Sequence, residues 1–404
     1  MQVGKQEKVT AAQQLADDHH QRLAADSRRR PRSRRAPSAM ICARTVFRCF
    51  KVLERIGDRV TGAAGPVFVT FAVLLVGLGT TCFFTILLPT LPFPILTTPL
   101  CVLIALNLHG HYFYVTRVRP GFVDPSAPLP TDLAPPIRPL EIRPGRIEDS
   151  RVLWANRGAF DASPHGKAPM TRATVTKCRR CGVIRPERAH HCRICNRCVL
   201  KYDHHCPHLH LLGINQCVGL HNERHFVLFM AYLVIGCLAF CFAGWDTALH
   251  ALGFSGDWND WPYTIPATFF LLTYILAAVM SLAVGIMCAF HLRTIANGET
   301  TVESQDHDVY RKVAVQRQET FTNSYDLGPG LRNLALFFNV SIGRYKPSPA
   351  PYPLYTLLLP VRVQPYTDGW GWARREGYER GHGGVRRGEE LTDEEFGEDH
   401  MEEP

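Results

Sequence analysis

Charged residues are missing from four long stretches of this chain, although they make up 20% of its 404 residues. The charge-free stretches are Val67–Leu88, Pro94–Val115, Phe226–Trp245 and Tyr263–Phe290. Each has the roughly 20 apolar residues that a helix needs to cross the hydrocarbon core of a bilayer. This absence of charge excludes a purely soluble protein and a disordered one. The polar N-terminal region also lacks an apolar core, so we expect no cleavable secretory signal.

Lys and Arg are also absent from two connections between these stretches. The hairpin Pro89–Phe93 is uncharged, and Asp246–Pro262 has acidic but no basic residues. Basic residues flank the other ends of the stretches, at Arg55, Arg59, Arg117, Arg119, Arg224 and Arg293. Because Lys and Arg concentrate in cytosolic connections, we predict that both termini and the segment Thr116–His225 face the cytosol.

The expected fold class is an α-helical integral membrane protein with four transmembrane helices. A cytosolic Cys-rich domain that holds two zinc ions is expected between the second and third helices. The predicted parts are a partly disordered cytosolic segment 1–65, membrane helices in 66–116, a linker and zinc-binding domain in 117–225, membrane helices in 226–290, a cytosolic C-terminal region 291–372 and an acidic disordered tail 373–404.

Two polar features stand out next to these apolar stretches. Asn107, His109 and His111 interrupt the second stretch, and we expect them to form hydrogen bonds between helices. The segment Ser348–Pro360 is rich in Pro and is expected to lie along the surface of the protein.

The cysteines are clustered rather than spread along the chain. Seven of the 14 lie between Cys178 and Cys217, together with six His. Overlapping Cys-x2-Cys pairs with adjacent His indicate zinc, and the reducing cytosol disfavours disulfides. Two tetrahedral sites need eight ligands, so the cluster fills both and leaves one thiol free. The spacing alone does not say which His of each adjacent pair is a ligand, or which Cys is spare.

A nucleic-acid reader is the structural alternative for this cluster, because zinc modules with many arginines contact phosphates. Arg179, Arg180, Arg185, Arg188, Arg193 and Arg197 lie in it. However, its position between membrane helices keeps the domain at a membrane surface. We therefore expect the lipid bilayer as a partner, and no nucleic acid.

Four adjacent residues in the cluster, Asp203-His204-His205-Cys206, combine an acid, two imidazoles and a thiol. Other motifs surround them along the chain: Arg185-Pro186-x-Arg188, Asn215-x-Cys217-Val218-Gly219-x2-Asn222-x3-Phe226, Thr300-Thr301-Val302-Glu303, and Asn339 within Leu336-Phe337-Phe338-Asn339-Val340. Together with the four apolar stretches, these motifs resemble the DHHC family of protein S-acyltransferases. Thr300, Thr301 and Glu303 look like the family's TTxE motif, and Asn339 looks like the Asn of its C-terminal motif.

The resemblance implies a set of zinc ligands and a catalytic residue. The first zinc would be held by Cys178, Cys181, His191 and Cys198, and the second by Cys192, Cys195, His205 and Cys217. Cys206 would remain unligated as the nucleophile, activated by His204 and Asp203. The implied activity is transfer of a palmitoyl group from acyl-CoA to cytosol-facing cysteines of membrane-associated proteins, at the endoplasmic reticulum or Golgi.

The residue types suit this chemistry. A free thiol has a pKa near 8.5 and is only about 3% thiolate at pH 7, whereas attack on a thioester needs the thiolate. A His two residues away can accept the proton, and an Asp can fix the tautomer of that His. Candidate partners for the phosphates of CoA are Arg185, Arg188, His190 and Lys201.

The acyl chain also needs a place in the protein. A palmitoyl chain has about 15 apolar carbons, and burial of each stabilises the complex by ~0.8 kcal/mol. We therefore expect a cavity between the membrane helices near Cys206. Its candidate lining residues lie in Phe226–Trp245 and Tyr263–Phe290.

One departure from the family pattern follows the tetrad. The family usually has Pro-Trp there and reaches the last zinc Cys sooner, whereas here Pro207 precedes the extra residues His208–Gly213. They are a real insertion or a mistaken exon boundary. A real insertion is expected to loosen the second zinc site, or to let His208 or His210 replace a ligand. The alternative function is therefore a weak or inactive family member that acts as a membrane scaffold. A small-solute transporter is disfavoured, because no membrane stretch holds a charge.

Overall fold

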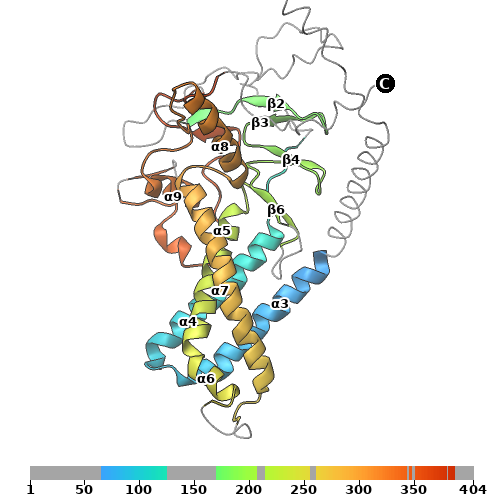
Figure 1. The fold of residues 1–404 in the computed structure, drawn as a ribbon, viewed down its shortest axis with the longest axis vertical. Coiled ribbons are helices and arrows are strands. Elements are labelled where there is room, and N and C mark those ends of the chain that lie inside the picture. The colour runs from blue at the N-terminus through green and yellow to red at the C-terminus, as the bar shows by residue number, and fades with distance from the viewer. Residues whose placement is uncertain are drawn as a thin grey trace, which may run out of the picture. The chain divides into compact units, whose positions relative to one another are not determined.

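The computed structural model describes residues 65–124, 170–206, 214–254, 261–343, 345–347, 351–379 and 381–386. Within these residues, long helices form one end and short hairpins with C-terminal helices form the other (Figure 1). The predicted N-terminal segment up to residue 64, most of the linker, the extra residues 208–213 and the acidic end of the chain lie outside the described residues.

Four helical segments in the described part of the chain are long and apolar enough to cross a membrane. They are α3 (Gly65–Cys82), continued by the π-helix η1 (Phe83–Leu87) and the 3-10 turn η2 (Leu88–Thr90), then α4 (Pro94–Arg117), α5 (Glu223–Ala243) and α7 (Ala267–Ala296). The Cys-rich region lies between the second and the third of them, so the predicted fold class of a four-helix membrane protein is confirmed.

The ends of two membrane helices differ from the sequence-based boundaries. Helix α5 begins at Glu223 rather than Phe226, and α7 continues to Ala296 rather than ending at Phe290. The added turns carry polar side chains that are buried against other parts of the protein, as Arg224 and His291 are. Neighbouring protein groups therefore allow the helices to extend beyond the charge-free stretches.

Helix α5 is central in the bundle and packs against α4 and α7. The largest hydrophobic cluster joins all four membrane helices, through residues such as Ala72, Leu108, Phe229 and Val284. The same cluster contains Val218 of the Cys-rich domain. Apolar packing is therefore continuous from the membrane helices to that domain. A short helix, α6 (Trp245–Ala251), follows the end of α5 that is far from the Cys-rich domain.

We predict above that the polar residues of α4 form hydrogen bonds between helices, and this is confirmed for His111. The Nδ1 atoms of His111 and His225 lie 3.0 Å apart, which joins α4 to α5. Asn107 instead donates to the backbone oxygens of Leu103 and Leu358, and the second of these lies in the C-terminal region.

Three antiparallel hairpins form the Cys-rich domain. They pair β2 (Val175–Lys177) with β3 (Ile184–Pro186), β4 (His190–Cys192) with β5 (Arg197–Val199), and β6 (His204–Cys206) with β7 (Gln216–Val218). Isolated two-stranded hairpins are marginally stable at best in water. Since each strand has three residues, the domain needs links between the hairpins.

The C-terminal region returns to this domain. It contains α8 (Thr301–Gln316), α9 (Gly330–Phe338), the 3-10 turn η4 (Leu354–Leu357) and β8 (Gly371–Ala373), which pairs with β1 (Met170–Arg172). Packing continues past residue 372, because the buried Arg374 forms an ion pair of 2.7 Å with Glu187.

Candidate metal centres and catalytic site

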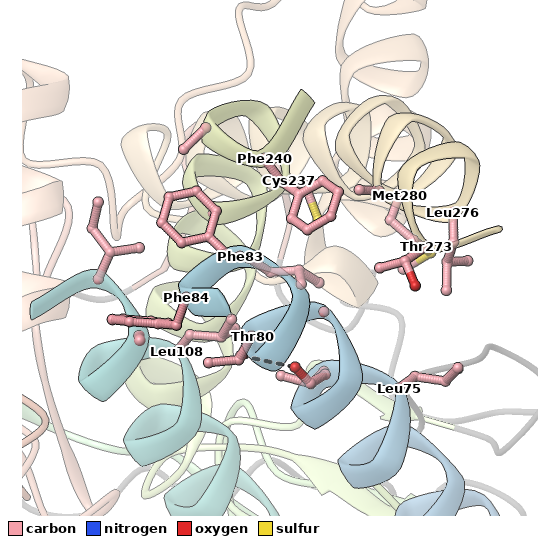
Figure 2. A pocket seen from close by; sticks show the side chains of 18 of the residues that line it. Leu75, Thr80, Phe83, Phe84, Leu108, Cys237, Phe240, Thr273, Leu276 and Met280 are labelled. Carbon is pink, nitrogen blue, oxygen red and sulfur yellow. Dashed lines mark hydrogen bonds between the residues drawn. The ribbon is translucent and has the colours of Figure 1, made fainter. Parts of the chain in front are cut away.

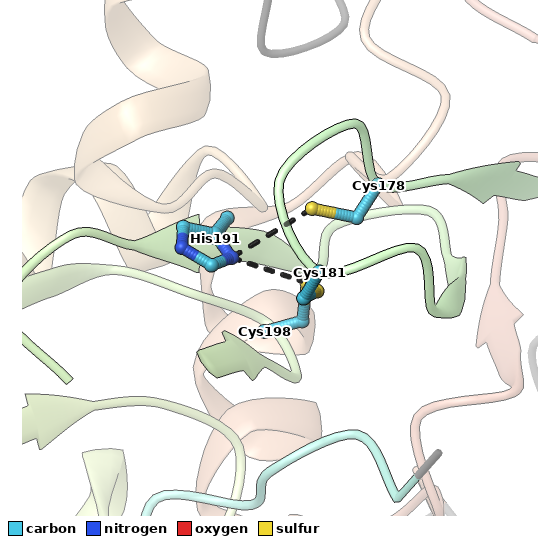
Figure 3. Close-up of side chains that lie close together, drawn as sticks. All are labelled: Cys178, Cys181, His191 and Cys198. Carbon is cyan, nitrogen blue, oxygen red and sulfur yellow. Dashed lines mark hydrogen bonds between the residues drawn. The ribbon is translucent and has the colours of Figure 1, made fainter. Parts of the chain in front are cut away.

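The first candidate metal centre joins two hairpins. Cys178 and Cys181 come from the turn between β2 and β3, whereas His191 and Cys198 face each other across β4 and β5. Figure 3 shows the three thiols converging on the Nδ1 side of the imidazole. Nδ1 of His191 lies 3.7 Å from Sγ of Cys178 and 3.9 Å from Sγ of Cys198. The thiols of Cys181 and Cys198 are 3.4 Å apart.

The second centre joins the next pair of hairpins. Cys192 and Cys195 lie at the turn between β4 and β5, and His205 and Cys217 are paired across β6 and β7. Nδ1 of His205 lies 3.5 Å from Sγ of Cys192, 3.5 Å from Sγ of Cys195 and 3.3 Å from Sγ of Cys217.

Both centres have the dimensions of a tetrahedral zinc site. Zn–S bonds of about 2.3 Å and Zn–N bonds of about 2.0 Å place neighbouring ligand atoms roughly 3.5–3.8 Å apart. The four ligand atoms of each group lie within 4.8 Å of one another. These are the two ligand sets that the family resemblance implied. Each ion would tie one hairpin to the next, which is the link that strands of this length need.

The alternation of side chains along β6 separates the catalytic candidates from the metal. Successive residues of a strand point to opposite faces. His205 points to the second metal centre, so His204 and Cys206 share the other face. Six of the seven Cys in this region belong to groups of described residues that could hold a metal ion. Cys206 does not belong to any of these groups. Cys206 is half-buried and packs against the main hydrophobic cluster.

Asp203 and His204 form a short hydrogen bond. Nδ1–H of His204 donates to Oδ2 of Asp203 over 2.6 Å, which directs Nε2 away from the carboxylate. Burial lowers the pKa of His204, but the hydrogen bond with Asp203 and the Cys206 thiolate outweigh it, and the pKa is raised to about 9. Burial also raises the pKa of Asp203, but its hydrogen bond to His204 and the N–H of Thr301 bring this pKa below its usual value. An imidazolium beside a thiol favours the thiolate.

The N-terminus of α8 holds Asp203 in place. Its Thr301 N–H donates to Oδ1 of Asp203, and the Thr301 hydroxyl donates to the Asp203 backbone oxygen, each over 2.7 Å. Negative charge is stabilised at a helix N-terminus. Thr300 and Glu303 form a capping box that starts this helix. The TTxE-like motif therefore lies against the Asp of the tetrad.

Two predicted phosphate contacts have internal partners instead. Arg188 forms a bidentate ion pair with Glu303, with distances of 2.6 and 2.7 Å, and Lys201 lies 2.6 Å from Glu223. All four side chains are buried. This placement argues against a role for Arg188 and Lys201 in binding CoA and indicates a structural role.

The other predicted positions have mixed surroundings. Arg185 is buried and donates from Nε to the Thr176 hydroxyl over 3.4 Å. His190 is half-buried, with its ring beside that of Tyr202. Asn339 caps α9 in the left-handed conformation and donates to the Gln364 oxygen over 3.0 Å. This bond ties the end of α9 to the chain that follows.

His291 of α7 is a site residue that the sequence analysis missed. Its Nδ1 lies 3.8 Å from Oδ2 of Asp203, and its ring centre lies 5.7 Å from that of His204. Phe226 meets both imidazoles edge-on. One carboxylate oxygen of Asp203 and one ring nitrogen each of His204 and His291 lie within 4.8 Å of one another. The available signal was the position of His291 directly after the apolar stretch that ends at Phe290.

An apolar cavity lies between the four membrane helices. It holds about 860 Å³ of space free of atoms, part of it open to the surroundings. Figure 2 shows Phe83, Phe84 and Phe240 at its wall, opposite Leu276 and Met280. The cavity takes residues from all four helices, including α3 and α4, which the sequence analysis had not named as lining. Leu108 and Leu233 line it and belong to the cluster against which Cys206 packs.

The extra residues after Pro207 lie outside the described residues, but the strands on both sides of them are described. His205 remains opposite Cys217, and Cys206 remains opposite Gln216. The second candidate metal centre is therefore complete without His208 or His210. Residues 207–213 belong to the connection of a hairpin, where added length has a small entropic cost.

The fold and the site define a class of membrane protein: four spanning helices, a Cys/His domain with two metal centres and a thiol beside an Asp–His pair. Residues 173–308 match the family model described as DHHC palmitoyltransferase. This part of the chain is therefore similar to a DHHC palmitoyltransferase domain.

Named relatives agree with this assignment. The chain is 33% identical over 223 residues to palmitoyltransferase ZDHHC16 of Mus musculus. This match covers 52% of this chain and 57% of that protein. It is 32% identical over 198 residues to ZDHHC2 of Homo sapiens, covering 45% of this chain and 49% of the relative. It is 32% identical over 225 residues to palmitoyltransferase pfa3 of Aspergillus fumigatus, and this match covers 53% of this chain and 34% of the relative. The matches thus span about half the length of the animal relatives.

Proposed function

We propose that this chain is a protein S-palmitoyltransferase that moves a long-chain acyl group from acyl-CoA to cysteine thiols of membrane-associated proteins. The observation that carries the proposal is the position of Cys206. It lies outside both metal centres, on the same strand face as His204, and it packs against the apolar cluster that reaches the cavity.

The first step forms an acyl-enzyme. The Cys206 thiolate attacks the thioester carbonyl carbon, a new C–S bond forms, and the bond to the sulfur of CoA breaks. The leaving thiolate takes a proton from His204, whose pKa is raised to about 9 by Asp203 and Cys206 before acylation. In the second step His204 accepts the proton of the acceptor thiol. That thiolate attacks the acyl-enzyme and releases Cys206. Asp203 keeps the imidazole oriented in both steps.

The metal centres support this chemistry structurally. Zinc at the second centre would be held by His205 and by Cys192, Cys195 and Cys217, on the face of β6 opposite the thiol. Its contribution is to fix the backbone on both sides of Cys206. Of the four predicted contacts for the phosphates of CoA, the half-buried His190 is the most accessible, and the acyl chain is assigned to the cavity in Figure 2.

Labelled fatty acyl-CoA tests the proposal on the purified chain in detergent. We expect hydroxylamine-sensitive labelling that is lost in Cys206→Ser and kept in Cys241→Ser. Cys241 is a matched control, because it is a half-buried thiol of α5 outside the metal centres. Labelling that persists in Cys206→Ser would defeat the assignment of the nucleophile. No labelling of the wild-type chain would favour the scaffold function instead.

A further inference from the structure

The chain segment around η4 has an apolar surface, although it is not part of the four membrane helices. Residues 347–361 contain no Asp, Glu, Lys or Arg. The side chains of Leu354, Tyr355 and Leu358 are 49%, 60% and 55% exposed. In Figure 1 the short orange-red helix of this segment lies beside the membrane helices, below α9. Apolar side chains gathered on one exposed surface mark an interaction site.

Contacts with α4 show how far the segment descends along the bundle. Nδ2 of Asn107 donates to the backbone oxygen of Leu358 over 2.8 Å. Asn107 lies ten residues before Arg117, the end of α4 next to the Cys-rich domain. At 1.5 Å per residue, Leu358 is therefore about 15 Å below that end of the helix. This distance from the end of the helix compares with a thickness of ~30 Å for a bilayer core.

Two further contacts place neighbouring residues at similar depth. The hydroxyl of Tyr232, in the third turn of α5, donates to the oxygen of Leu357 over 2.8 Å. Pro360 packs so closely against the backbone of α4 at Gly110 that an added Cβ there would collide with its ring. The segment thus enters, turns and returns on the surface of α4 and α5.

The backbone of the segment is prepared for an apolar environment. Irregular backbone inside a membrane is tolerated only where its polar groups have partners. The oxygens of Thr356, Leu357 and Leu358 accept hydrogen bonds from Arg224, Tyr232 and Asn107 respectively. Pro353 and Pro360 have no N–H that needs an acceptor. These bonds also account for polar side chains in otherwise apolar helices.

We propose that Leu354–Val361 is a re-entrant segment inserted into the leaflet on the side of the Cys-rich domain, where phospholipid acyl chains are its partner. Its exposed side chains are apolar, as are exposed side chains of the neighbouring helix α4 such as Leu106 and Phe113. Exposed basic residues, Lys346 and Arg362, flank it on both sides. Basic side chains at such positions reach lipid headgroups while apolar neighbours stay in the hydrocarbon. Its contacts with the membrane helices α4 and α5 favour lipid over a protein partner.

Photo-crosslinking tests the insertion without using enzymatic activity. The full chain carries p-benzoylphenylalanine in place of Leu358 and is reconstituted in phosphatidylcholine nanodiscs. The matched control carries the same probe at Val315, an exposed apolar residue of α8. We expect illumination to give a phospholipid adduct at position 358 and none at position 315. Fragmentation should place the bond on an acyl chain.

A second position protects the test against a misfolded variant. Leu354 takes the probe in the same way, because its side chain is also about half exposed. Adducts at the headgroup alone, adducts with a second copy of the chain, or no lipid adduct from either position in folded protein would overturn the proposal. Activity of the wild-type chain is measured separately, so failure of the proposed function is not confused with failure of insertion.

Discussion

Asp203 uses both carboxylate oxygens at once, and this explains much of the site at the scale of single residues. Oδ2 accepts from His204, and Oδ1 accepts from the N-terminus of α8. The carboxylate therefore cannot rotate without losing a partner. Because it fixes Nδ1–H of His204, the other nitrogen of that ring is available on the side of Cys206. Orientation of a base by a buried Asp is worth orders of magnitude in rate in other enzymes.

The raised pKa of His204 gives a pH-dependent prediction for Asp203→Asn. With the pKa at about 9 the imidazole is charged at pH 7.5. Loss of the Asp203 carboxylate moves this pKa down toward the usual 6.5, so the charged fraction at pH 7.5 falls about tenfold. Alkylation of Cys206 by iodoacetamide should slow by a similar factor at that pH, as followed by mass spectrometry. Alkylation rates of Asp203→Asn that equal those of the wild type throughout pH 6 to 9 would contradict this prediction.

His291 is predicted to be a positioning residue for His204. Removal of its ring in His291→Ala leaves a gap beside His204 and Phe226. We expect the rate of acyl-enzyme formation to fall about tenfold, within the usual range for general acid–base effects, with KM for acyl-CoA unchanged. His291→Phe restores the ring and should recover part of the rate.

A matched control for His291 is available on another membrane helix. His109 of α4 is exposed and bonds only to the backbone oxygen of Ala105 among the described contacts. His109→Ala should leave the rate unchanged. Equal effects of the two variants, or a rise in KM alone, would remove His291 from the positioning of the base.

At the scale of elements, the three-residue strand β6 and the first turn of α8 do most to shape the site. Alternation in β6 sends His205 to the second metal centre and leaves His204 and Cys206 on the opposite face. The first turn of α8 binds Asp203 and at the same time presents Glu303 to Arg188. The guanidinium of Arg188 also lies 4.1 Å from the ring centre of Tyr325. The C-terminal region and the Cys-rich domain are thereby joined.

The Arg188–Glu303 pair is predicted to be costly to break from one side. Arg188→Met leaves a buried carboxylate without its partner, which typically costs about 3–5 kcal/mol. Arg188→Met combined with Glu303→Leu removes both charges and should be less destabilising than Arg188→Met alone. Thermal unfolding in detergent measures both. Arg386→Met, in an exposed ion pair with Glu319, serves as control and should cost under about 1 kcal/mol. A double variant less stable than the single one would contradict the prediction.

At the scale of the whole molecule, the membrane helices and the metal-linked hairpins depend on one another. The hydrophobic cluster that holds the helices together includes Ile214 and Val218 beside the second metal centre. Arg224 and Tyr232 of α5 bond to the C-terminal segment, and β8 returns to pair with β1. Loss of a metal is therefore expected to loosen the cavity as well as the hairpins.

Zinc content distinguishes the ligand cysteines from the free one. We expect two zinc ions per chain by elemental analysis, two in Cys206→Ser and about one in Cys217→Ser. Chelation should lower the midpoint of thermal unfolding, because structural zinc contributes on the order of 10 kcal/mol to folding in small domains. Less zinc in Cys206→Ser than in the wild type would show that this thiol is a ligand.

The local pattern of the sequence determined the four membrane helices of this protein. Absence of charge over about 20 residues predicts a membrane helix wherever it occurs, because the hydrocarbon core excludes charge. Residue type and spacing likewise predicted two metal centres and one spare thiol, since zinc selects thiolate and imidazole, whereas the individual ligands and the spare Cys were implied only by the family resemblance. Only the tertiary structure decided which distant side chains meet. Arg188 and Glu303 lie 115 positions apart, and Asn107 and Leu358 lie 251 apart. Such pairs follow from how the helices pack, and no local pattern contains that information.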